Sequence, residues 1–304
     1  MDKVINPGIP HVGERIFKLL DLSDLVRCFA VSKYWKRLSE HELSARRKIP
    51  FFEASKLGIA EVVKFLLEHP DFQSIDWTAK DQGKTAFHWA CYEGRTDVVK
   101  LFLDKSTIKD IGLNIKDGGR LTGFGRACRD GRSDVVKAML DHPNNKSIEM
   151  NIKDILGNTA LGLACYHGQR SVVRLLLEHP NSKCIDLNIR DNQGRTPFRL
   201  ACDNGQLDII SLLMEQSKDK GIDLNMKDNR GHTALEVIAT HNNELWRDVA
   251  DSGKPFVVKF LLENSPGTNL KIPTIGHMYR IKMRNPSIIR MFETFWHRQN
   301  KRQN

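Results

Sequence analysis

Apolar and polar positions recur along this chain with a period of 37 residues, which five evenly spaced threonines mark: Thr85, Thr122, Thr159, Thr196 and Thr233. Leu-Asn-Ile-Lys-Asp or a close copy precedes most of these threonines, and a β-branched pair follows each of the first four. A fixed period of this length is typical of stacked repeats, which usually bind other macromolecules rather than catalyse reactions. The period therefore predicts a repeat array with a binding function.

Within the copy at residues 154–190, the pattern predicts a turn, a short helix, a stop, a longer helix and a return strand. Asp154 to Gly157 is a tight-turn sequence in which the glycine supplies a positive φ. Thr159 occupies a helix N-cap position, and Gly168 is a typical C-terminal stop. Apolar residues at helical spacing then predict the second helix.

This unit resembles an ankyrin repeat, whose signature is Asp-x-x-Gly-x-Thr-Pro-Leu-His-x-Ala followed by Gly-x-x-x-Val-Val. Residues 191–201, Asp-Asn-Gln-Gly-Arg-Thr-Pro-Phe-Arg-Leu-Ala, match this signature closely, and residues 83–90 match its second part. The resemblance implies an all-α fold, an ankyrin-repeat solenoid in which helix pairs are joined by β-hairpin turns. The family's unit has about 33 residues, and the extra residues here lie near 179–186, between the second helix and the return strand.

The pattern divides the chain into three parts, residues 1–48, 49–265 and 266–304. Residues 49–265 hold about six repeats, the first of which lacks its leading turn. In the sixth repeat the second helix comes eleven residues late. Because eleven residues make about three helical turns, we expect the first helix of that repeat to extend through 236–250. The last part predicts a basic helical cap with one apolar face at 287–296.

Four of the six cysteines occupy one repeat position, six residues after a threonine and directly after an alanine: Cys91, Cys128, Cys165 and Cys202. A small, weakly polar side chain suits a closely packed helix face. We therefore predict buried structural thiols rather than disulfides or metal ligands. Free thiols in this number indicate a reducing compartment, the cytoplasm or the nucleus.

Positions that vary between the copies are free to serve binding. The ankyrin resemblance implies that a partner protein contacts the hairpin tips and the end of each first helix, on the concave face. Tyrosine and arginine dominate interface energetics, so Tyr92, Arg129 and Tyr166 are the expected anchors. The alternative for each single position is an ordinary solvated side chain. The candidates at the helix ends are Tyr92, Glu93, Arg129, Asp130, Tyr166, His167, Asp203 and Asn204, and those at the tips are Ile155, Gln193, Arg195, Arg230 and His232.

A basic residue comes just before the aspartate of each turn: Lys80, Lys116, Lys153, Arg190 and Lys227. Two interpretations stay open at this point. The basic row either offsets the neighbouring aspartates or favours an acidic partner.

The amino-terminal residues do not carry the repeat, but their apolar positions have helical spacing. They resemble an F-box, a motif of about 40 residues that docks on the adaptor subunit of cullin–RING ubiquitin ligases. The usual Leu-Pro-x-Glu opening is Ile-Pro-His-Val here. The alternative is a helical cap that covers the first repeat. The resemblance implies these docking residues: Pro10, Ile16, Phe17, Leu20, Asp24, Leu25, Val31 and Trp35.

The formal net charge of +10 is unevenly distributed over the 304 residues. Residues 1–48 and 266–304 are basic, whereas the array between them is nearly neutral. With Tyr279 and Trp296, the basic tail raises nucleic-acid binding as a further hypothesis, which we do not favour because basic terminal helices are common. There is no apolar run of the roughly 18 residues that a membrane span needs, and we expect neither a secretory signal nor a membrane partner.

The motifs that resemble catalytic sites are incomplete. Gly83-Lys84-Thr85 ends like a phosphate-binding loop, but the required upstream glycine is Thr78. We therefore predict no catalytic residue, cofactor or metal site. The expected function is that of a non-enzymatic adaptor, the substrate-recognition subunit of a cullin–RING (SCF-type) ubiquitin ligase, monomeric within a larger complex, with a client whose identity the sequence does not give. The alternative is an ankyrin scaffold without a role in ubiquitin transfer.

Overall fold

The computed structural model describes residues 51–68, 76–106, 111–240, 253–266, 268–274, 276–277 and 285–303. The chain forms two compact units, one from residues 1–127 and 132–149 and the other from residues 128–131 and 150–304. The predicted F-box-like segment lies outside the described residues.

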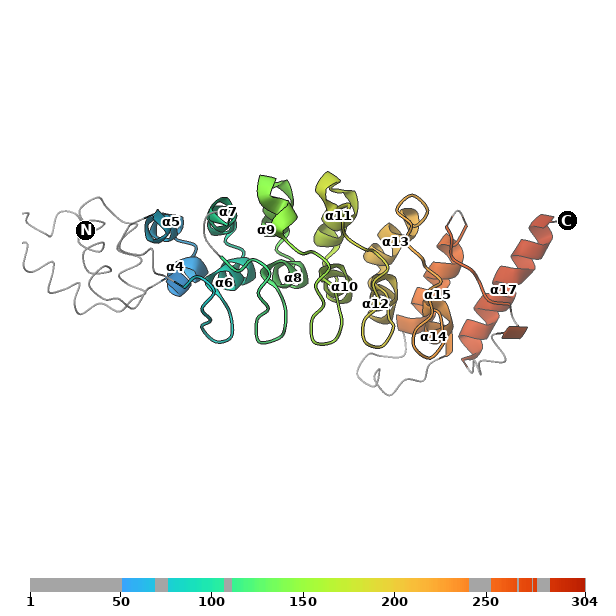
Figure 1. Cartoon of the computed structure of the whole chain (residues 1–304). Helices are drawn as coiled ribbons and strands as arrows, with labels where there is room; N and C mark the ends of the chain where they lie inside the picture. Colours follow the sequence, from blue (N-terminus) through green and yellow to red (C-terminus); the bar gives the residue numbers. More distant parts are fainter. Residues whose placement is uncertain are drawn as a thin grey trace, which may run out of the picture. The chain divides into compact units, whose positions relative to one another are not determined.

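The first unit consists of paired helices. Its helices are α4 (Phe51–Leu57), α5 (Ala60–Glu68), α6 (Ala86–Glu93), α7 (Thr96–Lys105) and α9 (Ser133–Asp141), with a 3-10 helix at Pro143–Ser147; α8 (Gly123–Arg129) crosses into the second unit. Helix α4 packs on α5 and α6 on α7, and along the stack α4 also packs on α6, α5 on α7 and α7 on α9. Figure 1 shows this part as two parallel rows of helices.

The second unit repeats this arrangement. Its helices are α10 (Ala160–Tyr166), α11 (Arg170–Glu178), α12 (Pro197–Asp203), α13 (Leu207–Glu215), α14 (Ala234–Thr240), α15 (Gly253–Asn264) and α17 (Pro286–Gln303). First helices α10, α12 and α14 pack on one another in order, as do second helices α11, α13 and α15, and α17 packs on α15 (Figure 1). The predicted stack of helix pairs is confirmed. In the described part of the chain, no helix combines the length and apolar character that crossing a membrane requires.

The repeated thiols lie in the apolar core, as predicted. Cys91, Cys128, Cys165 and Cys202 are buried and free of disulfides. Burial raises the pKa of the Cys128, Cys165 and Cys202 thiols, because a thiolate would be desolvated there. These side chains therefore act as small apolar residues between adjoining helices.

The periodic threonines cap the first helices, also as predicted. The Thr159 hydroxyl oxygen accepts a hydrogen bond from the Gly162 amide at 3.4 Å, and the other four threonines do the same three residues on. At Thr233 the predicted capping box is present, since the Thr233 amide donates to a Glu236 carboxylate oxygen at 2.8 Å. In the copy that contains Thr85, His88 takes the place that Glu236 has in this capping box.

Asparagine in the Leu-Asn-Ile-Lys-Asp motif joins neighbouring repeats through their main chains. Asn151 Nδ2 donates to the Cys184 carbonyl oxygen at 2.8 Å, and Asn151 Oδ1 accepts from the Asp186 amide at 3.0 Å. The equivalent side chains make the same two types of bond to the following copy: Asn114, Asn188 and Asn225. Each amide side chain thus binds one donor and one acceptor of the next repeat.

A second set of bonds joins the repeats at the ends of the first helices. The residue after the stop glycine reaches back to a carbonyl of the preceding copy: Arg95 Nε to Lys56 (2.9 Å), Arg132 Nε to Tyr92 (2.9 Å) and Gln169 Nε2 to Arg129 (3.2 Å). The last carbonyls of a helix have no partner within it, so these bonds complete the helix ends.

The turns are hairpin loops of two lengths. The Asp154 amide donates to the Asn158 carbonyl at 2.9 Å and Gly157 has a φ of 83°, which is the geometry of a three-residue loop with a glycine bulge. The first turn is one residue shorter, and Asp81 and Lys84 there form an isolated bridge. The predicted return strand is not observed as a strand among the described residues. The Asn and Lys side chains of that segment bind the next repeat instead of a strand ladder.

Glu236 connects the last repeat to the carboxy-terminal part. Burial by itself would raise the pKa of Glu236, but hydrogen bonds from Thr233 and from His277, whose Nε2 lies 2.7 Å from Glu236 Oε1, outweigh it and lower that pKa. On α17, Ile288 and Phe292 are buried, in agreement with the predicted apolar face. The extension of the first helix through 236–250 falls mostly on 241–252, outside the described residues.

Arg120 provides a test of the turn geometry. It has a φ of 60° at the position where the next copy has Gly157. A residue with a Cβ in the left-handed region destabilises the fold by about 1–2 kcal/mol relative to glycine. Glycine in turn has more conformational entropy in the unfolded chain, which offsets part of that gain. We expect Arg120→Gly to raise the free energy of unfolding by about 0.5–1 kcal/mol, measured from the urea midpoint.

The matched control is Gly157→Ala. A Cβ at this position would lie 2.6 Å from the Asn192 backbone nitrogen, and its φ of 83° is unfavourable. We expect a loss of about 1–3 kcal/mol. Equal midpoints for both variants and the parent chain would contradict this account.

Candidate protein-binding surface

The predicted helix-end residues of two successive copies meet in the second unit. Arg129 ends α8 and Asp130 follows it, and their side chains form an ion pair of 2.8 Å. Tyr166 and His167 end α10, and their rings pack edge to face with centroids 5.0 Å apart. Burial lowers the pKa of His167, the positive charge of Arg129 lowers it further, and Asp130 opposes them. These four residues are defined here as the helix-end cluster.

The Tyr166 ring makes the helix-end cluster suitable for binding a protein. Tyr166 is 43% exposed although it is large and aromatic. The cluster also presents an arginine–carboxylate pair and an imidazole whose pKa is lowered. A rigid aromatic residue beside polar partners is typical of the centre of a protein interface.

The hairpin tips of the second unit form a row. The Asn192 amide donates to the Leu156 carbonyl at 3.0 Å, and the Asn229 amide donates to the Gln193 carbonyl at 3.2 Å. Ile155 and Leu156 at one of these tips are 60% and 59% exposed. The predicted tip residues Gln193 and Arg230 are also exposed, and His232 is half-buried. The tip of the copy that contains Thr159 is therefore apolar, whereas the two following tips are polar.

Arg195 and Asp203 belong to an internal ion-pair network, which the sequence did not indicate. Arg195 Nε lies 2.7 Å from Asp191 Oδ2, and Arg199 Nε lies 2.5 Å from Asp203 Oδ1. Arg199 also approaches Asp228 Oδ2 at 3.5 Å, which connects this copy to the next. Burial raises the pKa of Asp203 more than the arginines lower it. The two side chains thus contribute to the packing of the repeats.

Asn204 is directed toward its own helix. Its Nδ2 donates to the Leu200 carbonyl oxygen at 2.8 Å, and the side chain is half-buried. The Leu200 carbonyl also accepts the Asn204 backbone amide at 3.3 Å, so the Asn204 side-chain amide donates within its own repeat.

Tyr92 and Glu93 lie in the first unit, where both are half-buried. Tyr92 packs edge to face on Trp89, with ring centroids 6.0 Å apart, and the Arg126 guanidinium lies 5.7 Å from the Tyr92 ring. Lys84 lies over the Trp89 ring at 4.4 Å. Tyr92 is therefore held among cations and another aromatic ring. Trp89 was missed in the sequence, although it occupies a slot where other copies have smaller apolar residues or arginine.

The basic row before the turns takes a role that neither interpretation anticipated. Lys80 Nζ donates to the Lys116 carbonyl oxygen at 2.8 Å, and Lys153 Nζ donates to the Arg190 carbonyl oxygen at 2.8 Å. Arg190 reaches the Asn229 side chain at 2.8 Å. These three basic side chains join successive turns.

A family model for ankyrin repeats (3 copies) matches residues 21–117, 107–191 and 183–273, which together cover most of the chain. The first match begins inside the segment that resembles an F-box. No curated protein sequence matches the chain.

Two solved structures support the same fold. The chain is similar to EF0377, an ankyrin repeat protein, with 25% identity and a TM-score of 0.51, over 61% of this chain and 87% of that one. It is also similar to the ankyrin repeat domain of Bcl-3, a unique member of the IkappaB protein family. That similarity has 21% identity and a TM-score of 0.62, over 81% of this chain and 98% of the other.

Two substitutions distinguish binding residues from packing residues. Arg199→Met removes the nearer of the two cations beside Asp203, which keeps Arg195 at 4.0 Å, and the cation beside Asp228, so we expect a loss of about 3 kcal/mol in the free energy of unfolding. Tyr166→Ala removes a ring that is 43% exposed, and we expect a change within about 0.5 kcal/mol. Urea unfolding followed by circular dichroism measures both. Equal losses for the two variants would place Tyr166 in the packing of the repeats.

Proposed function

Because this chain belongs to the ankyrin-repeat family, we propose that it is a non-enzymatic adaptor that holds a client protein on the helix-end cluster and the neighbouring hairpin tips. The observation that carries the proposal is the exposure of Tyr166, Ile155 and Leu156, large apolar side chains at positions where the two following copies have polar residues. A single exposed apolar side chain is common on protein surfaces and costs little free energy. One aromatic and two aliphatic side chains exposed within one copy are typical of a binding site.

The client contacts follow from the side chains available. Tyr166 provides the central apolar anchor, Arg129 and Asp130 provide charged contacts, and Ile155 extends the surface at the tip. We do not expect direct client contacts from Arg195, Asp203 and Asn204. Their side chains bind other residues of the repeat stack, so they support the surface indirectly. In the first unit, Tyr92 with its cationic neighbours offers a further contact.

The more specific proposal is that the chain is the substrate-recognition subunit of a cullin–RING ubiquitin ligase. It rests on the F-box-like spacing of Ile16, Phe17, Leu25, Val31 and Trp35. In that role the chain would bring the client close to the ligase, and the partner enzymes would do the chemistry. The proposed division is an F-box-like segment at 1–48, repeats at 49–265 and a basic cap at 266–304.

A scaffold without a role in ubiquitin transfer is the second candidate. The ankyrin family match that begins at residue 21 favours it, because residues 21–48 are then part of the repeat array. In that case the amino-terminal helices would cover the first repeat, and the client surface would stay the same.

The client surface is tested by affinity capture with the full chain and identification of the retained proteins. For a captured client, Tyr166→Ala is expected to weaken binding about 30-fold, the equivalent of about 2 kcal/mol for a central anchor. Lys220→Ala, at an exposed position outside the proposed surface, is the control and should leave the affinity unchanged. A client that binds both variants equally would contradict the proposed surface.

The ligase role is tested by a pull-down with the purified adaptor subunit. We expect the full chain to retain the adaptor, and the double variant Leu25→Ala/Trp35→Ala to lose it, because these residues carry the F-box resemblance. Tyr166→Ala should retain it, which separates adaptor binding from client binding. Adaptor binding that survives in the double variant counts against the F-box, and no binding by the parent chain favours the scaffold.

A further inference from the structure

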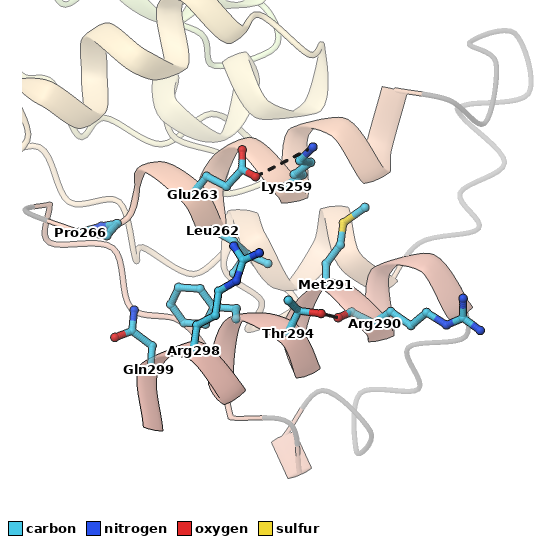
Figure 2. Close-up of a pocket in the computed structure, with 10 residues that line it drawn as sticks. Lys259, Leu262, Glu263, Pro266, Arg290, Met291, Thr294, Arg298 and Gln299 are labelled. Atoms are coloured by element: carbon cyan, nitrogen blue, oxygen red, sulfur yellow. Dashed lines mark hydrogen bonds and ion pairs between the residues drawn. The ribbon is translucent and has the colours of Figure 1, made fainter. Parts of the chain in front are cut away.

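The carboxy-terminal helices α15 and α17 enclose a groove of about 460 Å³ that lies apart from the helix-end cluster. Figure 2 shows Lys259, Leu262 and Glu263 on α15 facing Met291, Thr294 and Arg298 on α17. Leu262 and Glu263 lie three and four positions after Lys259, and Met291, Thr294 and Arg298 are three and four positions apart, so a single face of each helix contributes. The volume is within the range of sites that accept several ligand side chains.

The floor of the groove is apolar. Among the lining residues, Leu262 is 4% exposed, and Met291 and Phe295 are half-buried. Methionine adapts its shape to different partners, and a phenylalanine ring offers a large contact area. A ligand that enters the groove must therefore supply apolar side chains.

The rim of the groove is positively charged. Lys259 and Glu263 neutralise each other, with Nζ and Oε1 3.9 Å apart. Arg290 and Arg298 are exposed, and neither forms an ion pair with another described residue. In Figure 2 the Arg298 side chain reaches between the helices beside Leu262, whereas Arg290 extends outward at one end of the groove. The two residues are eight positions apart on α17, which corresponds to about 12 Å along a helix.

The aromatic residues here do not suit nucleic-acid binding. Trp296 Nε1 donates to the Pro273 carbonyl oxygen at 3.2 Å, which anchors the tryptophan to the preceding loop. The half-buried Phe295 packs edge to face on Trp296, with centroids 5.6 Å apart. Binding of single strands uses exposed rings on which bases stack. An apolar floor between two separated arginines favours a peptide.

We infer that this groove binds a short acidic amphipathic segment of a partner protein, a second binding surface beyond the client surface proposed above. Apolar side chains one helical turn apart on the segment contact Leu262, Met291 and Phe295. Carboxylates about two turns apart pair with Arg290 and Arg298, in the manner of helix-in-groove recognition. The charge complementarity fixes the position of the segment, and the apolar contacts provide most of the affinity.

The test uses a fluorescent twelve-residue probe peptide with leucine at its fourth and eighth positions, glutamate at its fifth and twelfth, which lie on one flank of the leucine face about two turns apart, and alanine and glutamine elsewhere. Binding to the full chain is followed by fluorescence anisotropy. We expect saturable binding that Arg290→Glu/Arg298→Glu weakens at least about tenfold. The matched control is Lys218→Glu/Lys220→Glu, which changes the net charge equally at exposed positions of the same unit and should retain the affinity.

Two comparison probes complete the experiment. A peptide with serine in place of both leucines should bind at least about tenfold more weakly, and a single-stranded oligonucleotide should not displace the parent peptide. Equal affinity for the parent chain and the arginine double variant overturns the inference. So do equal binding of the serine peptide, displacement by the oligonucleotide, and self-association of the chain that the arginine double variant abolishes.

Discussion

Each helix pair in this protein stays folded because its neighbour covers the apolar face that the pair cannot bury alone. The inner sides of the first helices are filled by small residues, with Cys165 and Cys202 among them, so that successive helices approach closely. At the ends of these helices, side chains such as Gln169 complete the backbone hydrogen bonding of the preceding copy. Apolar burial thus provides the stability, and polar bonds between copies fix how the pairs are placed.

The repeat period was sufficient to predict features that depend on local chain geometry. A threonine before a helix, as at Thr159, and a glycine in a tight turn, as at Gly157, have the same physical role wherever they occur, so the caps and turns followed from the sequence. The buried thiols followed because four copies placed cysteine in one slot. These predictions needed no knowledge of distant contacts.

The polar network could not be predicted in the same way. Which carboxylate Arg199 reaches depends on the relative positions of two adjacent copies, and the sequence offers Asp191, Asp203 and Asp228 as alternatives. Variation between copies identified Arg195 as a binding candidate, although its partner is Asp191 in the same turn. Variable positions therefore include residues whose charges pair with one another within the stack, as well as residues that face a partner.

The asparagine that joins each copy to the next has a consequence for how such a chain changes over time. Because Asn151 bonds to the Cys184 carbonyl oxygen and the Asp186 amide, its partners are main-chain groups that every residue type except proline, which lacks the N–H, possesses. Side chains in the receiving segment are then free to diversify without loss of alignment. After duplication or deletion of a whole 37-residue unit, each asparagine side chain would meet the same backbone groups of the next repeat. The array can therefore change its length while the hydrogen bonds between adjacent repeats are conserved.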